Sequence, residues 1–559
     1  MREYDLVIRG GTILDAAGTP RYKADLAVRD GKIAKISGKI AVGAAQELDA
    51  SGCMVAPGVI DLHTHYDAQL NWDPYATLGG WFGVTTVTIG QCGFGFAPVR
   101  PEDRDLSMRM MNRIEAIPLE SMRLGIRWDW ETYPEYLDSL AGQGLGLNVA
   151  SLFPFSPLRA YVMGVLPSRE RRATPAEIDQ MKLLFREGMQ AGSFGFAVDK
   201  NLEDRSEDGG AIPSHIASEE ECLGLAEVLG EFGVGFMGWT TGYFLDKTGQ
   251  FDLLKKMLKA SGTPLHVGMG QSPAEQQWVN ECRAEGLPVA PERVAAFPDA
   301  RYTLAEFNQY DYMDSWAHAL VGTPEERMAK LRNPEVREAM RREAAVPLHA
   351  RVNWPKTKVL EVVHERNYKY EGLTIPQVAE LMGKEPVDAF IDLALDEDLQ
   401  TEFGFRNDGP EVEEAMAAGI RNPYTHISVS DGGAHTRFSV LARWPVEFLS
   451  YWVRDKEVVT LEQAHYKMSA YAAWVGGYTD RGVLSVGKAA DIMVYKLDEL
   501  GLLYDDPIFS NDFPGGERRL VQKPKGLRYI LVNGVVTFVE NECTGALPGR
   551  LLRSYDMAS

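Results

Sequence analysis

Hydrophobic and polar residues alternate in short runs along the first fifty positions of the chain. Apolar residues dominate residues 6–9, 12–15, 25–28 and 32–36, with small or polar residues between the runs. Arg29-Asp30-Gly31 lies between alternating apolar positions, which is a strong hairpin signal, and Gly10-Gly11 is expected to turn the chain as well. The pattern therefore predicts short antiparallel strands joined by tight turns.

The C-terminal end has the same pattern of short strand-like runs separated by turns. Residues 491–495, 528–532 and 535–538 are strand-like, and Asn533-Gly534 separates the last two runs. An isolated hairpin is only marginally stable in water, so these strands need partners. We therefore expect both ends to combine into one small β-sandwich, built from residues 1–56 and 483–545.

The middle of the chain alternates between two hydrophobic periods. Strand-like runs cover residues 83–89, 146–152, 193–198, 234–237 and 264–268, and helical patterns cover residues 175–190, 219–232 and 253–260. Strands that alternate with helices indicate βα units and a parallel sheet, which makes the fold class α/β. The length of the alternation favours a closed (β/α)8 TIM barrel over residues 57–482.

One stretch near residues 300–373 breaks this rhythm, because it is rich in Trp, Tyr and charged residues. A long irregular segment inside a regular fold is often functional. We expect an insertion that forms a lid or a wall of the substrate cavity.

Composition narrows the possible partners. The 559 residues are 45% hydrophobic and 25% charged, as in ordinary globular proteins, and the net charge is −21. This acidic balance disfavours nucleic acid and anionic membranes, which leaves a small-molecule substrate as the expected partner. The five scattered cysteines indicate a reducing compartment. With no apolar stretch of signal-peptide or membrane-spanning type, the expected location is the cytoplasm.

The sharpest local motif is the His-x-His sequence at the end of an apolar run, residues 57–65. In a strand, side chains two residues apart share a face, so His63 and His65 are expected to project together. Barrel enzymes keep their chemistry at this end of the strands, and imidazole is a good ligand for zinc, iron or nickel. A pair of surface or turn histidines is the alternative.

A second motif brings Asp431 from a strand into a glycine-rich turn. A carboxylate there can bind a metal and can move a proton between the attacking water and the leaving group. A turn or N-cap aspartate is the alternative.

His435 and Arg437 follow Asp431 closely and are candidates to anchor an anionic substrate group, since Arg pairs with carboxylates in bidentate fashion. Arg437 could equally form a structural ion pair.

These motifs together resemble the amidohydrolase superfamily, and most closely its N-acyl-D-amino-acid deacylase (D-aminoacylase) branch. The resemblance spans nearly the whole chain and rests on residues 5–11, 58–65, 430–432, 487–491 and 533–534. It implies a barrel with a small β-sandwich made from both termini, a metal held by His63, His65 and Asp431, and Asp431 as the catalytic group. Members of the family often self-associate, so a homo-oligomer is also implied.

Cys92 carries the resemblance to the D-aminoacylase branch, in which a cysteine in the matching motif is a metal ligand. A thiolate suits zinc, although a small buried hydrophobic residue is the alternative. The family's two further histidine ligands are absent from residues 235–241 and 266–271. His266 lies near, but earlier and on the opposite expected strand face. We therefore expect one divalent ion rather than two, with zinc first and iron or manganese also suited.

Two further residues are candidates for substrate contact. Lys200 follows the expected fourth strand, where related enzymes can carry a carboxylated lysine that bridges metals, but a salt bridge or solvent contact is favoured here. Trp239 could line an apolar pocket, although aromatic residues more often belong to the core.

The sequence thus predicts a metal-dependent hydrolase of an amide-like C–N bond, in an N-acyl amino acid, a cyclic amide or an imide. One alternative is hydrolysis of a C–C or ester bond, or decarboxylation, on the same scaffold. A non-catalytic binding protein is the other. Release of an amine separates amide cleavage from the remaining chemistries.

Overall fold

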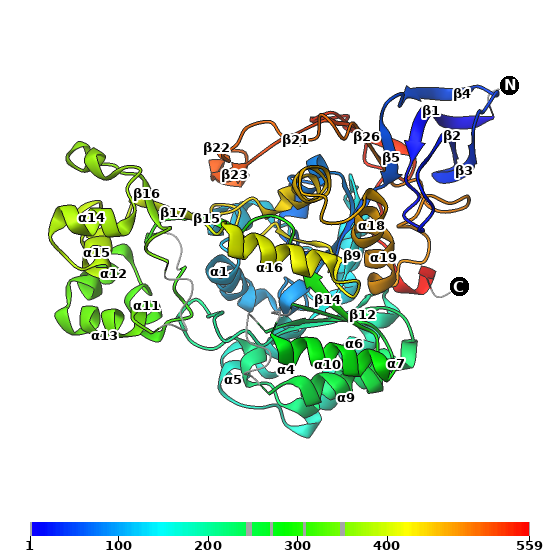
Figure 1. The fold of residues 1–559 in the computed structure, drawn as a ribbon. Coiled ribbons are helices and arrows are strands. Elements are labelled where there is room, and N and C mark those ends of the chain that lie inside the picture. Colours follow the sequence, from blue (N-terminus) through cyan, green and yellow to red (C-terminus); the bar gives the residue numbers. More distant parts are fainter. Residues whose placement is uncertain (1–2, 242–248, 269–271, 306–308, 347–352, 558–559) are drawn as a thin grey trace.

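The computed structural model describes residues 3–241, 249–268, 272–305, 309–346 and 353–557. Its central region consists of parallel strands surrounded by helices. The N-terminal strands, drawn in blue, lie on one side of this region, and a helical lobe lies at the opposite end of the molecule (Figure 1).

Both ends of the chain contribute to one nine-stranded sheet in the order β27-β26-β25-β20-β5-β1-β2-β3, with β4 paired to β1. β5 is the connecting strand, because it runs parallel to β1 and antiparallel to β20. The expectation that the two ends share a sheet is thus confirmed. The strands are β1 (Tyr4–Ile13), β2 (Tyr22–Arg29), β3 (Lys32–Ser37), β4 (Ala44–Asp49), β5 (Met54–Pro57), β20 (Ile492–Tyr495), β25 (Leu527–Val532), β26 (Val535–Val539) and β27 (Glu542–Cys543).

Two of the three expected turns are confirmed. β2 and β3 are joined at Asp30-Gly31, and β25 and β26 at Asn533-Gly534, and all four residues have positive φ. The expected turn at Gly10-Gly11 is wrong. β1 continues through this pair, and its register with β2 shifts between Ile8 and Gly11, as in a β-bulge. Gly10 has a φ of 66°, so the flexible pair bends the strand without reversing it.

Three parallel sheets form the central region: β6-β8-β9, β10-β11-β12-β13-β14-β18, and β19-β7. Hydrogen bonds continue across their breaks, from the Leu62 amide to the Ser428 carbonyl (3.1 Å) and from the Leu152 amide to the Ile89 carbonyl (2.9 Å). The strands are β6 (Val59–Asp61), β7 (His63–Thr64), β8 (Val84–Ile89), β9 (Asn148–Ser151), β10 (Phe153–Pro154), β11 (Gly195–Asp199), β12 (Phe236–Thr240), β13 (Leu265–Gly268), β14 (Val289–Arg293), β18 (His426–Ile427) and β19 (Val429–Gly432).

The helices between these strands begin where their sequences predict. α6 (Pro175–Gln190) starts after Thr174, which forms a capping box with Glu177, and α7 (Glu219–Phe232) starts after Ser218 in the same way. Each box satisfies amide donors that the first helical turn leaves unpaired. The third expected helix is also present, as α9 (Phe251–Ser261).

Residues 299–406 form the helical lobe, within the described ranges. Its antiparallel sheet has the order β15-β17-β16, and its helices pack around a hydrophobic cluster separate from that of the central region. The elements are β15 (Asp299–Tyr302), α11 (Asp314–Ala319), α12 (Pro324–Arg332), α13 (Pro334–Ala344), β16 (Lys358–Glu361), α14 (Ile375–Met382), α15 (Pro386–Asp396) and β17 (Glu402–Arg406). Arg113 links the central region to the lobe through both oxygens of Asp311, at 2.5 and 2.8 Å.

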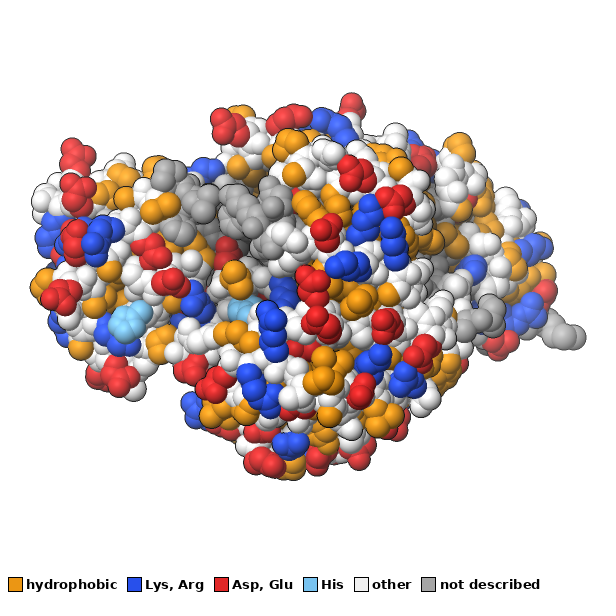
Figure 2. Space-filling model, turned by 90° about the horizontal axis from the view of Figure 1, so that it is seen from below, with side chains coloured by type: hydrophobic (Ala, Val, Ile, Leu, Met, Phe, Trp, Pro, Cys, Tyr) orange, Lys and Arg blue, Asp and Glu red, His pale blue; other side chains and the backbone are white. Residues whose placement is uncertain are grey.

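Acidic and basic side chains are interspersed on the face of the molecule shown in Figure 2. This face has no large patch of a single charge, although the net charge of the chain is −21. Among the described residues, no helix is both long and apolar enough to cross a bilayer.

Asp491 ties the nine-stranded sheet to the central region. It follows directly from the turn before β20, and its carboxylate accepts hydrogen bonds from the Asn533 amide (2.7 Å) and from the Asn148 side chain of β9 (3.1 Å). Arg481 pairs with it at 2.5 Å, and both side chains are at most 4% exposed. Burial raises the pKa of Asp491, so its charge depends on these partners.

We predict that Asp491→Ala lowers the free energy of unfolding by about 3–5 kcal/mol, because it leaves the buried Arg481 without a counter-charge. Denaturant unfolding measures the change. Asp480→Ala is the matched control, since Asp480 pairs with the same arginine but is 45% exposed, and its loss should cost about 0–1 kcal/mol. Equal losses in the two variants would contradict a buried tie at Asp491.

Candidate metal centre

Two neighbouring strands carry the candidate ligands. β7 contains His63, and His65 follows it directly, while β19 contains Asp431. β19 pairs with β7 in parallel, and the His65 amide donates to the Gly432 carbonyl at 2.7 Å. This register sets Asp431 beside both histidines, although the motifs lie far apart in the sequence.

The outer nitrogens of the two imidazoles face one point. His63 Nε2 lies 3.2 Å from Cys92 Sγ and 3.9 Å from Asp431 Oδ1, and His65 Nε2 lies 3.1 Å from the same Oδ1. Three of the predicted ligands also form one group with donor atoms within 4.8 Å of one another: His63, His65 and Cys92. All four candidate ligands therefore meet in one place.

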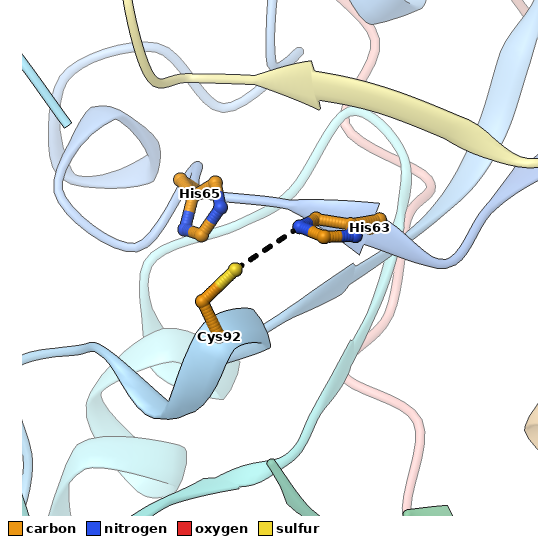
Figure 3. A group of neighbouring side chains, drawn as sticks. All are labelled: His63, His65 and Cys92. Atoms are coloured by element: carbon orange, nitrogen blue, oxygen red, sulfur yellow. Dashed lines mark hydrogen bonds between the residues drawn. The ribbon is translucent and has the colours of Figure 1, made fainter. Parts of the chain in front are cut away.

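Cys92 reaches this point from a single 3-10 turn, η3 (Gln91–Gly93), that follows β8. Figure 3 shows its sulfur directed between the two imidazole rings, with the contact to His63 dashed. The Thr240 hydroxyl at the end of β12 donates to the same sulfur at 3.3 Å. Thr240 thus lies in the stretch where the family resemblance leads us to expect a histidine ligand.

Three residues at the centre have a strained backbone. Cys92, Asp431 and His435 all have left-handed backbones, with φ of 52°, 54° and 49°. Such conformations are uncommon for residues with side chains and cost about 1–3 kcal/mol each, and they gather at functional sites. The chain therefore holds these three side chains in directions that relaxed strands and turns would not give.

The inner nitrogens of the imidazoles face buried carboxylates that the sequence analysis did not identify. His63 Nδ1 lies 3.0 Å from Glu292 of β14, and His65 Nδ1 lies 3.5 Å from Glu115, which follows α1 (Arg104–Ile114). Metal-binding histidines commonly donate their second nitrogen to such a group. Glu292 ends an apolar run, which is a usable signal, whereas nothing near Glu115 in the sequence indicates its role.

Burial and charge set the protonation states here. Burial disfavours the charged imidazolium, yet the charge and hydrogen bonds of Glu292, together with Asp431, raise the pKa of His63 to about 9. Burial also disfavours the ionised carboxylate of Asp431, but His65, which lies 3.1 Å away, and the other nearby histidines lower its pKa below the usual range. Burial raises the pKa of Cys92 and of Glu115 well above their ordinary values.

These residues fit a divalent metal. The ring nitrogens of His65 are buried and have no hydrogen-bond partner among the described residues, because the 3.1 Å approach of Nε2 to Asp431 lacks hydrogen-bond geometry. A cation would bind the lone pair of the unprotonated His65 ring nitrogen and would favour the thiolate form of Cys92, which burial alone opposes. Imidazole, carboxylate and thiolate together form a zinc-type ligand set.

The centre opens into a cavity of about 310 Å³. Its described lining includes the four candidate ligands, Glu115 and His435, and also Arg113, Asp311 and Tyr312, which bring the helical lobe to the cavity. The His435 side chain is 30% exposed, and its Nε2 lies 3.5 Å from Asp431 Oδ2 and 3.6 Å from Glu115. His435 therefore has access to a molecule in the cavity.

The other three residues predicted to contact substrate are absent from the described lining. Lys200 donates to the carbonyls of Ser214 and Ala217, Arg437 pairs with Glu517, and Trp239 is 1% exposed and donates to Gln250 at 2.7 Å. Their contact with substrate stays a prediction.

A glycine permits the close approach of β19 to the His65 segment. Gly433 has a φ of 91°, and a Cβ there would lie 2.6 Å from the backbone of His65 and Tyr66. We predict that Gly433→Ala displaces the ligands and lowers the metal bound per chain, as measured by elemental analysis. Gly487→Ala is the control, because Gly487 has a φ of 90° and no atom within 4 Å of the added Cβ. It should cost about 1–2 kcal/mol of stability and leave metal content unchanged. Full metal content in Gly433→Ala would be contrary to this account.

Known proteins share this architecture. Residues 46–537 match the amidohydrolase family. The D-aminoacylase of Alcaligenes xylosoxydans xylosoxydans is 26% identical, over 98% of this chain and 97% of its own. A structure of N-acyl-D-glutamate deacylase from Bordetella bronchiseptica, with zinc and a phosphonate inhibitor, has a TM-score of 0.67 at 24% identity, and covers 99% of this chain and 100% of its own. A D-aminoacylase structure, from work on its binuclear metal centre, has a TM-score of 0.67 at 21% identity, covering 98% and 100%. Since the family match covers most of its length, the chain belongs to the amidohydrolase family.

Proposed function

We propose that the protein is a metal-dependent hydrolase that cleaves the amide C–N bond of an N-acyl amino acid. One observation carries this proposal: His63 Nε2, His65 Nε2, Asp431 Oδ1 and Cys92 Sγ converge at the wall of a cavity large enough for a small substrate. The relatives named D-aminoacylase and N-acyl-D-glutamate deacylase give the bond type and the substrate class.

The proposed cofactor is one divalent ion, most suitably zinc, held by His63, His65, Asp431 and Cys92. Such an ion activates water and polarises a substrate carbonyl when it is bound. The absence of histidines at the ends of β12 and β13, where Thr240 and Gly268 stand, supports one ion rather than two.

Asp431 is the proposed proton carrier. Its Oδ1 faces the histidines, while its Oδ2 faces His435 at the open side of the cavity. Its lowered pKa keeps the carboxylate ionised, which is the form that accepts a proton from the attacking water. The same group then returns the proton to the departing nitrogen, which leaves as an amine. We propose that His435 contacts the polar part of the substrate beside it.

We also propose a domain division close to the sequence expectation, with an insertion that extends to residue 406 instead of 373. The three parallel sheets would form one (β/α)8 barrel over residues 57–482, supported by the pairing of β19 with β7 and by the hydrogen bonds across the strand breaks. The composite sheet would belong to a β-sandwich of residues 1–56 and 483–545, and the helical lobe would be an insertion in the barrel. All five cysteines are free, which supports a reducing location such as the cytoplasm.

We predict that Asp431→Asn lowers kcat by about 10²–10⁴-fold, because the amide can neither accept nor return the proton. Release of free amino acid from a panel of N-acyl-D- and N-acyl-L-amino acids measures turnover. Asp408→Asn is the control, since Asp408 is 55% exposed and lies outside the described cavity lining. Unchanged turnover in Asp431→Asn would remove Asp431 from the mechanism.

Removal of the metal with a chelator should abolish turnover, and added zinc should restore it. Because a ligand of the folded state stabilises that state, the stripped protein should also be less stable. The loss is about 2.7 kcal/mol relative to zinc at one hundred times its Kd. Thermal unfolding with and without zinc checks this second effect. Full turnover by protein shown to be free of metal would contradict the proposed function.

A further inference from the structure

On its buried side, His63 contacts a hydrogen-bonded pair of residues, Glu292 and His266, that the proposed mechanism leaves unused. His63 Nδ1 lies 3.0 and 3.1 Å from the two oxygens of Glu292, and His266 Nε2 of β13 makes a short hydrogen bond to one of them. His266 is 1% exposed. One carboxylate therefore joins two histidines from different strands.

This arrangement leaves little freedom to the groups that form it. Glu292 accepts the Nδ1 proton of His63 and the Nε2 proton of His266, so each ring has one specified tautomer. In the neutral ring, His63 Nε2 carries no proton, and it is directed at Cys92 and Asp431, where the proposed metal would lie. The His266 ring packs against His63, with ring centroids 5.9 Å apart, and its Nε2 is directed at Glu292.

Strand β13 provides the space for the carboxylate. A Cβ at Gly268 would lie 3.0 Å from Glu292 Oε1, a distance shorter than nearly all real contacts of this kind. Gly268 stands two residues after His266, so both face the same side of the strand. A larger residue there would press against the carboxylate that holds His63.

We infer that Glu292 and His266 are positioning residues, which fix the ring and tautomer of His63 so that its Nε2 can hold the metal. The inference rests on the proposed metal centre and goes beyond it. In this chain β13 supports the centre from behind through His266, which lies with His63 and Glu292 in a cluster that does not include Cys92 or Asp431. Glu115 lies 3.5 Å from Nδ1 of His65, whereas Glu292 lies 3.0 Å from Nδ1 of His63. The carboxylate behind His63 is therefore the closer of the two.

The inference is tested by zinc affinity, measured by competition with a chromophoric chelator on the full chain. Loss of such a supporting group typically weakens metal binding about 10–100-fold, and we expect this range for Glu292→Gln and His266→Phe. His266→Gln should retain most of the affinity, because its amide NH2 can donate to Glu292 as the ring Nε2 does. His465→Phe is the control, since it also removes a buried histidine hydrogen bond, to Tyr495 at 2.7 Å, outside the described cavity lining.

A second readout separates positioning from mere stability. The visible absorption of the cobalt-substituted protein reports ligand geometry, so it should change in Glu292→Gln and His266→Phe and stay as wild type in His465→Phe. Where a substrate is known, kcat should fall with KM nearly unchanged. Wild-type affinity and spectrum in both site variants would overturn the inference. So would a second equivalent of zinc that disappears in His266→Phe, because His266 and Glu292 would then be ligands.

These outcomes are distinct from failure of the proposed function. A wild-type protein that binds zinc but hydrolyses no N-acyl amino acid leaves the positioning test intact and removes the substrate proposal. A wild-type protein that binds no zinc removes the metal centre and the positioning inference with it.

Discussion

The parallel pairing of β7 with β19 is the constraint on which the rest of the site depends. It aligns two segments far apart in the sequence, and a backbone hydrogen bond from His65 to Gly432 fixes their separation. Without this register, Asp431 would not lie near either imidazole. The left-handed backbone at Asp431 and the absence of a side chain at Gly433 are local consequences, because the turn must leave β19 at once and pass close to the His65 backbone.

Burial gives this arrangement its electrostatic character. The candidate ligands lie where water screens their charges poorly, so each charge needs a nearby opposite charge or a hydrogen-bond partner. Glu292 answers the imidazole of His63 from behind, while Asp431 faces both histidines from the cavity side. Cys92 Sγ accepts a hydrogen bond from the Thr240 hydroxyl and contacts His63 Nε2, but burial and nearby carboxylates still raise the pKa of its thiol. A bound cation would favour the thiolate and would reduce the repulsion among the acidic groups.

The sequence was most informative where the signal was local. The helices at residues 175–190 and 219–232 have their predicted bounds, because the capping residues and the apolar period agree. His63 and His65 were recognisable because a strand of period two fixes the direction of both. The turn predicted at Gly10-Gly11 is wrong, because two glycines permit a turn but do not require one when the strand can continue through a bulge. Lys200 lies near the expected strand end, but nearby carbonyl groups hold its ammonium group, which no spacing rule reveals.

The residues that the sequence did not reveal share one property: their roles depend on contacts between elements. Glu115 follows a helix and lies 3.5 Å from His65, and the lobe residue Asp311 pairs with Arg113, which lies 198 positions earlier in the sequence. The role of Gly268 depends on Glu292, because the absence of a side chain at Gly268 leaves room for the Glu292 carboxylate. An absent histidine in the sequence is therefore not simply a lost ligand. The space it leaves can hold a group that orients a remaining ligand, so the number of ligand-type residues in a motif is a weaker guide than the contacts behind them.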